Sequence, residues 1–177
     1  MKKMIPCLIL VSFLMQGCSK SYDTSFEYDE GLVKLEMKND SLSYLRYIKE
    51  EQIISTIVLP YPVYQFDWGD VNNDGLPEVV VGVIKSTYFF PKKDKRLFIY
   101  HLDGDGQLSP MWLGSRVSCQ LLDFKVERDS VPALVHTLEL GADSNLYEVM
   151  YEQRGFGLRY KRHWPSACKD SILRRFQ

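Results

Sequence analysis

The stretch from Asp67 to Ile84, DWGDVNNDGLPEVVVGVI, decides how this chain folds. It consists of a short acidic loop followed by a continuous apolar run. Oxygen-bearing side chains recur in the loop at every second position, at Asp70, Asn72 and Asp74. Gly75 allows the sharp reversal that a residue with a Cβ atom resists. Because hard cations such as Ca²⁺ collect six or more oxygen ligands, the loop predicts a cation site.

The remainder of the chain predicts an all-β fold. The apolar run after the loop is typical of an inner strand, and Val33, Leu35 and Met37 alternate with charged residues at the period of a half-buried strand. Further strands rich in apolar and β-branched residues are expected over 44–48, 53–59, 63–68, 97–102 and 108–112. Helical periodicity is absent before Pro165. We expect only a short C-terminal helix over 166–177.

An internal repeat defines the expected architecture. Gln65-Phe66-Asp67-Trp68 matches Leu121-Leu122-Asp123-Phe124, 56 residues later, and residues 76–80 match 131–135 once one residue is dropped. A repeat of about this length with four strands is typical of a β-propeller blade. We therefore expect antiparallel β-meander units resembling two to three blades of an incomplete propeller, at about 26–60, 61–117 and 118–165. An open stack, a sandwich-like arrangement and part of a larger assembly all remain compatible with so few units.

The N-terminal residues indicate export and a lipid anchor. Lys2 and Lys3 precede an apolar stretch from Met4 to Met15, which is too short to span a bilayer and suits a signal peptide. The segment ending in Gly17-Cys18 resembles a bacterial lipobox. This implies a signal peptide over 1–17, lipidation of Cys18 and a polar tether over 18–25. An ordinary secretory signal with an incidental cysteine is the alternative. Ser19 after the cysteine favours the outer membrane of a bacterial cell envelope.

Two further cysteines, Cys119 and Cys168, remain after Cys7 is assigned to the signal peptide and Cys18 to the anchor. Disulfides persist in an exported compartment. The two residues could therefore form a bridge that ties the C-terminal segment to the start of a strand. Two buried free thiols are the alternative.

The loop sequence resembles a known repeat family. Residues 70–81, DVNNDGLPEVVV, are similar to an FG-GAP or VCBS-type repeat, in which such a loop joins two blade strands and binds Ca²⁺. The resemblance implies one Ca²⁺ site whose ligands come from Asp70, Asn72, Asp74, the Leu76 carbonyl and Glu78. Glu78 departs from the family's usual Asp. An EF-hand is excluded because Val81 occupies loop position twelve. An Asx-rich turn without metal is the alternative.

The functional expectation is a non-enzymatic, lipid-anchored envelope module that binds a protein or glycan partner. Catalytic motifs are absent, and His101, His136 and His163 lack metal-ligand spacing. The alternative is a small carbohydrate-active hydrolase or lyase that uses carboxylates such as Asp67 and Asp123. The 22 basic and 23 acidic residues are nearly balanced, and nothing in the composition suggests the basic face that a nucleic-acid partner needs, so such a partner is not expected.

Overall fold

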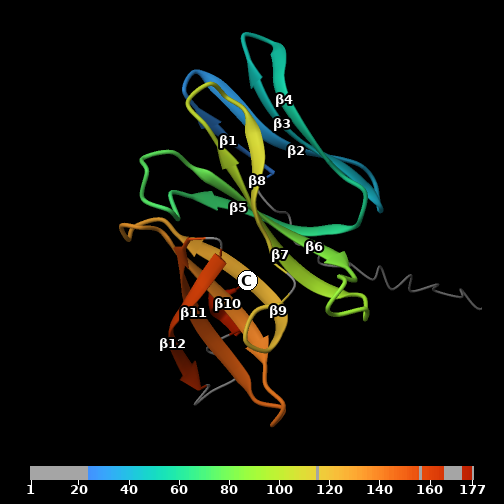
Figure 1. The fold of residues 1–177 in the computed structure, drawn as a ribbon, viewed down its shortest axis with the longest axis vertical. Helices are drawn as coiled ribbons and strands as arrows, with labels where there is room; N and C mark the ends of the chain where they lie inside the picture. Colours follow the sequence, from blue (N-terminus) through green and yellow to red (C-terminus); the bar gives the residue numbers. More distant parts are fainter. Residues whose placement is uncertain (1–23, 115, 156, 166–172, 177) are drawn as a thin grey trace, which may run out of the picture.

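The computed structural model describes residues 24–114, 116–155, 157–165 and 173–176. Across these residues the chain forms 12 strands in three four-stranded antiparallel sheets (Figure 1). The prediction of an all-β fold of blade-like meander units is therefore confirmed. Of the expected terminal helix, residues 173–175 are helical and 166–172 lie outside the described residues. Within the described part of the chain, no helix has the length and apolarity needed to cross a membrane.

Each sheet is made of strands that follow one another in the chain. The first contains β1 (Ser25–Tyr28), β2 (Gly31–Asn39), β3 (Leu42–Lys49) and β4 (Gln52–Leu59). The second contains β5 (Val63–Gly69), β6 (Glu78–Lys85), β7 (Asp94–Leu102) and β8 (Leu108–Leu113). The third contains β9 (Gln120–Glu127), β10 (Leu134–Leu140), β11 (Leu146–Arg154) and β12 (Gly157–Pro165).

The β5–β8 sheet lies between the other two sheets (Figure 1). Its two faces belong to separate apolar cores, because successive side chains of a strand point to opposite faces. Val79, Val81 and Val83 of β6 pack in the core shared with the first sheet. Val80 packs in the core shared with the third sheet. All four valines are fully buried, which explains why the run from Val79 to Ile84 has no polar alternation.

Trp68, near the end of β5, lies where all three sheets meet. Its ring stacks on Phe26 of the first sheet with ring centroids 4.5 Å apart. The guanidinium of Arg128, which follows β9 of the third sheet, lies 4.7 Å from the centroid of the Trp68 ring. Aromatic stacking and cation–π contacts each contribute about 1 kcal/mol beyond burial. This side chain therefore links the two outer sheets through the middle one.

The strand registers show that the two repeats differ around their first hairpin. Asp67 pairs with Val80, whereas Asp123 pairs with Leu138. The sequence alignment equated Val80 with Val135, three residues earlier. The register therefore shifts the alignment after the loop, because the β9–β10 pairing continues from Asp123 to Glu127, whereas the β5–β6 pairing ends two residues after Asp67, at Gly69.

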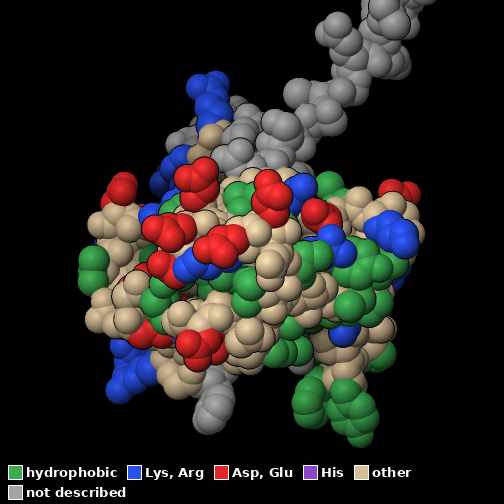
Figure 2. All heavy atoms as spheres, turned by 90° about the horizontal axis from the view of Figure 1, so that it is seen from above, with side chains coloured by type: hydrophobic (Ala, Val, Ile, Leu, Met, Phe, Trp, Pro, Cys, Tyr) green, Lys and Arg blue, Asp and Glu red, His purple; other side chains and the backbone are tan. Residues whose placement is uncertain are grey.

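Two hairpin turns of the first sheet carry acidic residues in the left-handed backbone region. Asp29 and Glu30 connect β1 to β2, and Glu50 and Glu51 connect β3 to β4, with φ values of 45°, 59°, 50° and 61°. Positive φ suits the two-residue turn that matches strand twist, but glycine or asparagine usually supplies it. Asp and Glu side chains gather on the face seen in Figure 2, which views the molecule from above. The four acidic residues line one hollow, and of them Asp29 forms an ion pair with Lys49 at 2.9 Å. These turns therefore combine backbone strain with a concentration of negative charge.

The double-sided burial of β6 can be tested directly. Val80→Ala and Val81→Ala face different cores, and each should lower the free energy of unfolding by about 2 kcal/mol through lost burial and a residual cavity. Val58→Ala on β4, where the side chain is 53% exposed, is the control and should change it by less than about 0.5 kcal/mol. Urea unfolding measures all three. A neutral effect at either buried valine would contradict the two-core arrangement.

The strain in the acidic turns gives a second prediction. Glu51→Gly should raise the free energy of unfolding by about 1 kcal/mol, because glycine adopts φ of 61° without steric cost. Glu51→Gln removes the same charge but keeps a side chain at this positive φ, so it should raise the free energy of unfolding much less. Thermal and urea unfolding of the two variants distinguish relief of strain from relief of charge repulsion.

Candidate metal site

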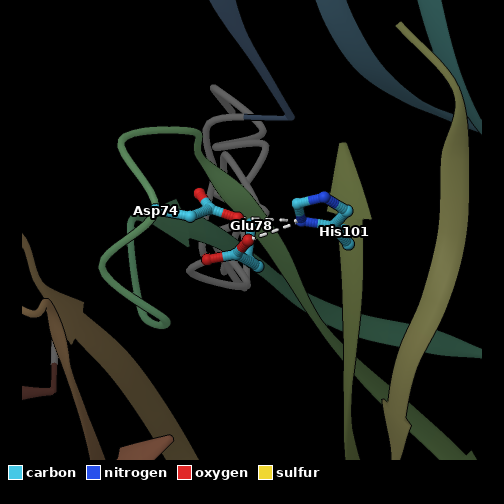
Figure 3. Close-up of side chains that lie close together, drawn as sticks. All are labelled: Asp74, Glu78 and His101. Atoms are coloured by element: carbon cyan, nitrogen blue, oxygen red, sulfur yellow. Dashed lines mark hydrogen bonds and ion pairs between the residues drawn. The ribbon is translucent and has the colours of Figure 1, made fainter. Parts of the chain in front are cut away.

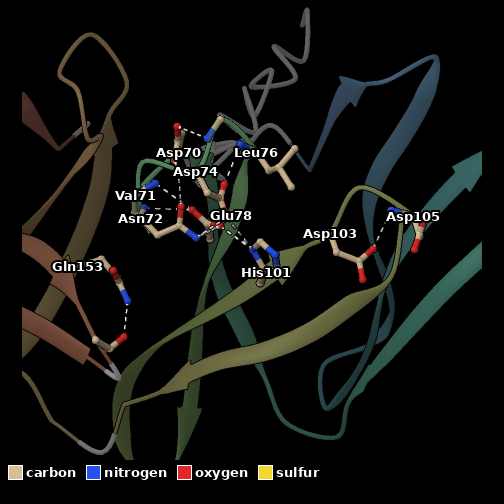
Figure 4. Close-up of polar contacts among 12 residues, drawn as sticks. Asp70, Val71, Asn72, Asp74, Leu76, Glu78, His101, Asp103, Asp105 and Gln153 are labelled. Carbon is tan, nitrogen blue, oxygen red and sulfur yellow. Dashed lines mark hydrogen bonds and ion pairs between the residues drawn. The ribbon is translucent and has the colours of Figure 1, made fainter.

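The acidic loop between β5 and β6 is held by its own side chains, which accept hydrogen bonds from its backbone (Figure 4). The Asp70 carboxylate accepts from the backbone N–H groups of Asp74 at 3.1 Å and Gly75 at 3.0 Å. Asn72 Oδ1 accepts from the Asp74 N–H at 2.9 Å, and Asp74 Oδ1 from the Leu76 N–H at 2.9 Å. Gly75 has a φ of 88°, and space around its Cα is open. Backbone conformation, rather than crowding, therefore requires glycine there.

Glu78, the first residue of β6, has a fully buried side chain at the base of the loop. Its Oε2 accepts hydrogen bonds from the backbone N–H groups of Val71 at 2.9 Å and Asn72 at 3.3 Å. Its Oε1 accepts from Asn72 Nδ2 at 3.0 Å and lies 2.8 Å from His101 Nδ1. Burial raises the pKa of this carboxyl, while the hydrogen bonds from His101 and Val71 oppose the rise.

Asp74, Glu78 and His101 form a group that could hold a metal ion (Figure 3). One potential ligand atom from each residue lies within 4.8 Å of the others. The Asp74 and His101 side chains are 39% and 27% exposed, whereas Glu78 is enclosed, so the group opens to solvent on one side. Two carboxylates and an imidazole are suitable donors for a divalent cation. The donor set alone does not select the metal.

The structure brings together some of the predicted ligands and adds one that was not predicted. Asp74 and Glu78 are in the group, and Asn72 donates to the Asp74 carboxylate at 2.8 Å. Asp70 lies in the same loop but outside this group, with its carboxylate on backbone N–H groups. His101 enters because Val79 pairs with Tyr100, which places the residue after Tyr100 beside Glu78. Sequence spacing could not reveal the role of His101, because His101 and Glu78 are 23 residues apart in the chain and meet only through the register of the β6–β7 hairpin.

The loop is also attached to the third sheet. Val71 is fully buried in the core between the second and third sheets. The Asp70 carbonyl accepts a hydrogen bond from the Ala133 N–H at 2.8 Å. Gly69 permits this approach, since a Cβ atom there would lie 2.8 Å from Val126 Cγ1. The conformation of the loop is therefore coupled to the contact between these two sheets.

The two carboxylates considered for catalysis bind backbone groups. Asp67 accepts from the Val126 N–H at 2.7 Å across the sheet interface, and from the Trp68 N–H at 2.9 Å. Arg128 forms an ion pair with the same carboxylate at 3.0 Å. Asp123 accepts from the Phe124 N–H at 2.9 Å. Asp67 therefore fastens β5 to β9, which is a structural role.

The other histidines have local partners. His136 is buried between two carboxylates, with Nε2 2.6 Å from Glu127 and Nδ1 3.0 Å from Glu148. Glu148 also pairs with Arg175 at 2.9 Å. His163 Nδ1 forms a hydrogen bond with the Tyr160 hydroxyl. These contacts agree with the expectation of packed or surface histidines.

Several sequence-predicted residues remain untested. Cys119 is a half-buried thiol whose pKa is raised by burial and by Glu139. Its expected disulfide partner Cys168 lies outside the described residues, as does the lipidation site Cys18. The bridge and the anchor therefore stay predictions.

No protein-family model matches the chain. No curated protein matches it at a significant level. The resemblance to FG-GAP or VCBS-type repeats thus rests on the sequence of the loop and stays a prediction.

Glu78 should be more important for stability than any exposed residue of the loop. Glu78→Ala leaves the buried N–H of Val71 without its acceptor, which should lower the free energy of unfolding by about 2 kcal/mol or more without added metal. Asp74→Ala removes a carboxylate at the exposed side of the group and should cost less than about 1 kcal/mol under the same conditions. Urea unfolding in a chelator measures both. Equal effects would contradict the structural role assigned to Glu78.

Proposed function

We propose that the protein is a lipid-anchored module of the bacterial cell envelope that binds partners without catalysis and is stabilised by a divalent cation in the acidic loop. The observation that carries the proposal is the acidic loop, in which the Asp74 and Glu78 carboxylates lie together beside His101 and which is joined to two sheets. The lipid anchor is proposed at Cys18, and the partner is a protein or a glycan.

The position of the loop supports a stabilising role for the cation. An ion there would be bound beside Glu78, whose Oε2 accepts a hydrogen bond from the buried Val71. The same loop carries the Asp70 carbonyl, which accepts a hydrogen bond from the Ala133 N–H beside the third sheet. An ion that neutralises the carboxylates in this geometry lowers their mutual repulsion and restricts the loop. It therefore stabilises the packing of the second sheet on the third.

Ca²⁺ is the cation we propose. The proposed oxygen ligands are Asp70, Asn72, Asp74, the Leu76 carbonyl and Glu78, of which the structure groups Asp74 and Glu78. Ca²⁺ takes oxygen ligands in flexible geometry. In this arrangement His101 positions the Glu78 carboxylate through the 2.8 Å contact and is not itself a ligand. A transition metal would instead use the imidazole nitrogen directly. The two arrangements differ in what His101 contributes to affinity.

The contacts of Asp67 and Asp123 favour a binding module over a hydrolase. A glycoside hydrolase needs one carboxylic acid and one carboxylate that face a shared substrate site. The Asp67 carboxylate instead accepts a hydrogen bond from the Val126 N–H and forms an ion pair with Arg128. The Asp123 carboxylate accepts a hydrogen bond from the Phe124 N–H. These interactions stabilise the fold. We therefore advance no catalytic role for this pair.

A thermal-unfolding experiment tests the proposal. The chain from Ser19 onward is melted in EDTA and in millimolar Ca²⁺. Ligand at a hundredfold excess over its dissociation constant adds about 2.7 kcal/mol to the free energy of unfolding, which corresponds to a rise in Tm of roughly 5 to 10 °C. The rise should disappear in Asp74→Ala.

His101→Gln separates the two metal classes. If Ca²⁺ binds through oxygen atoms, the variant should retain most of the Ca²⁺-induced rise in Tm, because glutamine can still donate a hydrogen bond to Glu78. A rise that occurs with Zn²⁺ or Mn²⁺ but not with Ca²⁺, and that is lost in His101→Gln, would assign the site to a transition metal. An unchanged Tm with every cation would reject the cation-stabilised module.

A further inference from the structure

The loop between β6 and β7 ends in a tight turn with two aromatic residues at its tip. The Thr87 N–H donates to the Phe90 carbonyl at 2.9 Å, and the Phe90 N–H donates to the Thr87 carbonyl at 3.2 Å. These reciprocal bonds leave Tyr88 and Phe89 as the two central residues. Their side chains are 94% and 75% exposed, and the two rings contact each other edge-to-face at 5.2 Å.

This composition is not explained by folding. Central positions of two-residue turns favour Gly, Asn, Asp and Pro, each for a conformational reason that tyrosine and phenylalanine do not share. Neither ring enters one of the apolar cores. Exposed large apolar groups that contribute no packing are typical of an interaction site.

The base of the turn is braced by cationic side chains. The ring of Phe90 lies 5.8 Å from the guanidinium of Arg96 and 5.4 Å from that of Arg116. Arg96 also donates to the Lys92 carbonyl at 3.2 Å and is itself buried. The turn is therefore fixed to the body of the second sheet, so the aromatic pair projects from a supported base.

Positive charge surrounds this base. Lys92 and Lys93 follow the turn in the chain and are exposed, and so is Arg116, whose guanidinium lies over the Phe90 ring. A hollow of about 270 Å³ there is lined by Phe90, Pro91, Lys92, Asp94, Arg96, Arg116, Cys119 and Gln120. Asp94 is the one acidic residue of this lining, and its Oδ1 accepts a hydrogen bond from the Lys95 N–H. The lining therefore has an excess of positive charge.

The acidic turns of the first sheet lie elsewhere in the molecule. In Figure 1 the tips of the β1–β2 and β3–β4 hairpins are at the top, whereas the β6–β7 loop is at the lower right. A surface that contacts Tyr88 and Phe89 therefore does not also have to accept Glu30, Glu50 or Glu51. The aromatic tip and its cations can approach a negative surface without repulsion from those turns.

We propose that residues 86–93 form a membrane-docking loop that inserts Tyr88 and Phe89 into the interface of a phospholipid bilayer containing anionic lipids. Aromatic rings favour the headgroup level of a bilayer, and lysine and arginine near an anionic leaflet are attracted to its surface. The layered order of the loop, with rings at the apex and Lys92, Lys93 and Arg116 behind them, matches the order of acyl boundary and headgroups. The hollow behind the tip would receive a headgroup phosphate.

A convex tip fits a bilayer better than a protein partner. Protein interfaces concentrate their energy in a central apolar patch that is enclosed by a surrounding rim. Here two rings project alone from a narrow turn, and the residues around them are cationic. The inference is independent of the metal site and of the Cys18 anchor, since it uses neither.

Fluorescence from the loop itself tests the proposal. The Phe89→Trp variant of the full chain is bound to vesicles of phosphatidylcholine and phosphatidylglycerol. The acyl chains are brominated in one set of vesicles and unmodified in the other. The tryptophan emission spectrum of the parent chain is subtracted from that of the variant. Met37→Trp on β2, where the native side chain is 60% exposed, is the matched control. The difference signal reports only the loop, whatever holds the remainder of the chain to the vesicle.

We expect the difference emission of Phe89→Trp to shift to shorter wavelength and to be quenched by brominated lipid, while that of Met37→Trp does neither. Adding Lys92→Glu and Lys93→Glu to Phe89→Trp should weaken loop partitioning at least about tenfold, as should vesicles of phosphatidylcholine alone. Equal, unquenched emission from Phe89→Trp and Met37→Trp on anionic vesicles would overturn the proposal. Insertion that is unaffected by the charge reversal would overturn the electrostatic part of it.

Discussion

The burial of β6 on both faces is the constraint on which the rest of the structure depends. Val79, Val81 and Val83 require one sheet against them, and Val80 requires another on the opposite side. A single four-stranded sheet cannot satisfy both demands, so the chain before β5 and the chain after β8 must each supply a covering sheet. Burial of each valine contributes about 1.5 to 3 kcal/mol. The three-layered arrangement follows from this one strand more than from any property of the outer sheets.

The acidic loop depends on the same strand for its conformation. Glu78 is the residue with which β6 begins, and its carboxylate closes the loop through Val71 and Asn72. The loop then reaches the third sheet through the Asp70 carbonyl. A buried carboxylate is costly unless it is hydrogen-bonded, and here backbone groups and His101 supply those bonds. Strand, loop and sheet interface are therefore one connected unit.

Much of the fold was predictable because its signals are local. The apolar run of β6, the alternation in β2 and the repeat between β5 and β9 all specify strands from neighbouring residues. The features that could not be predicted depend on the pairing of strands whose residues are far apart in the sequence. Ser25–Tyr28 is too short to stand out, yet it completes the first sheet by pairing with β2. His101 joins the site only through the β6–β7 register, and the shift at Leu138 depends on how far the pairing of β9 with β10 extends, which residue matching does not reveal.

The two apolar cores that flank the middle sheet share no residue, and each uses one face of that sheet. Energetically this resembles a short linear array, in which stability is a sum of terms for the individual layers and for the contacts between neighbours. Damage to one outer layer is then transmitted to the other only through the centre. The middle sheet is stabilised by contacts with both outer sheets, whereas each outer sheet is stabilised by contacts with the middle sheet alone. Such a molecule has a gradient of local opening free energies, highest in β6 and lower toward the two outer sheets.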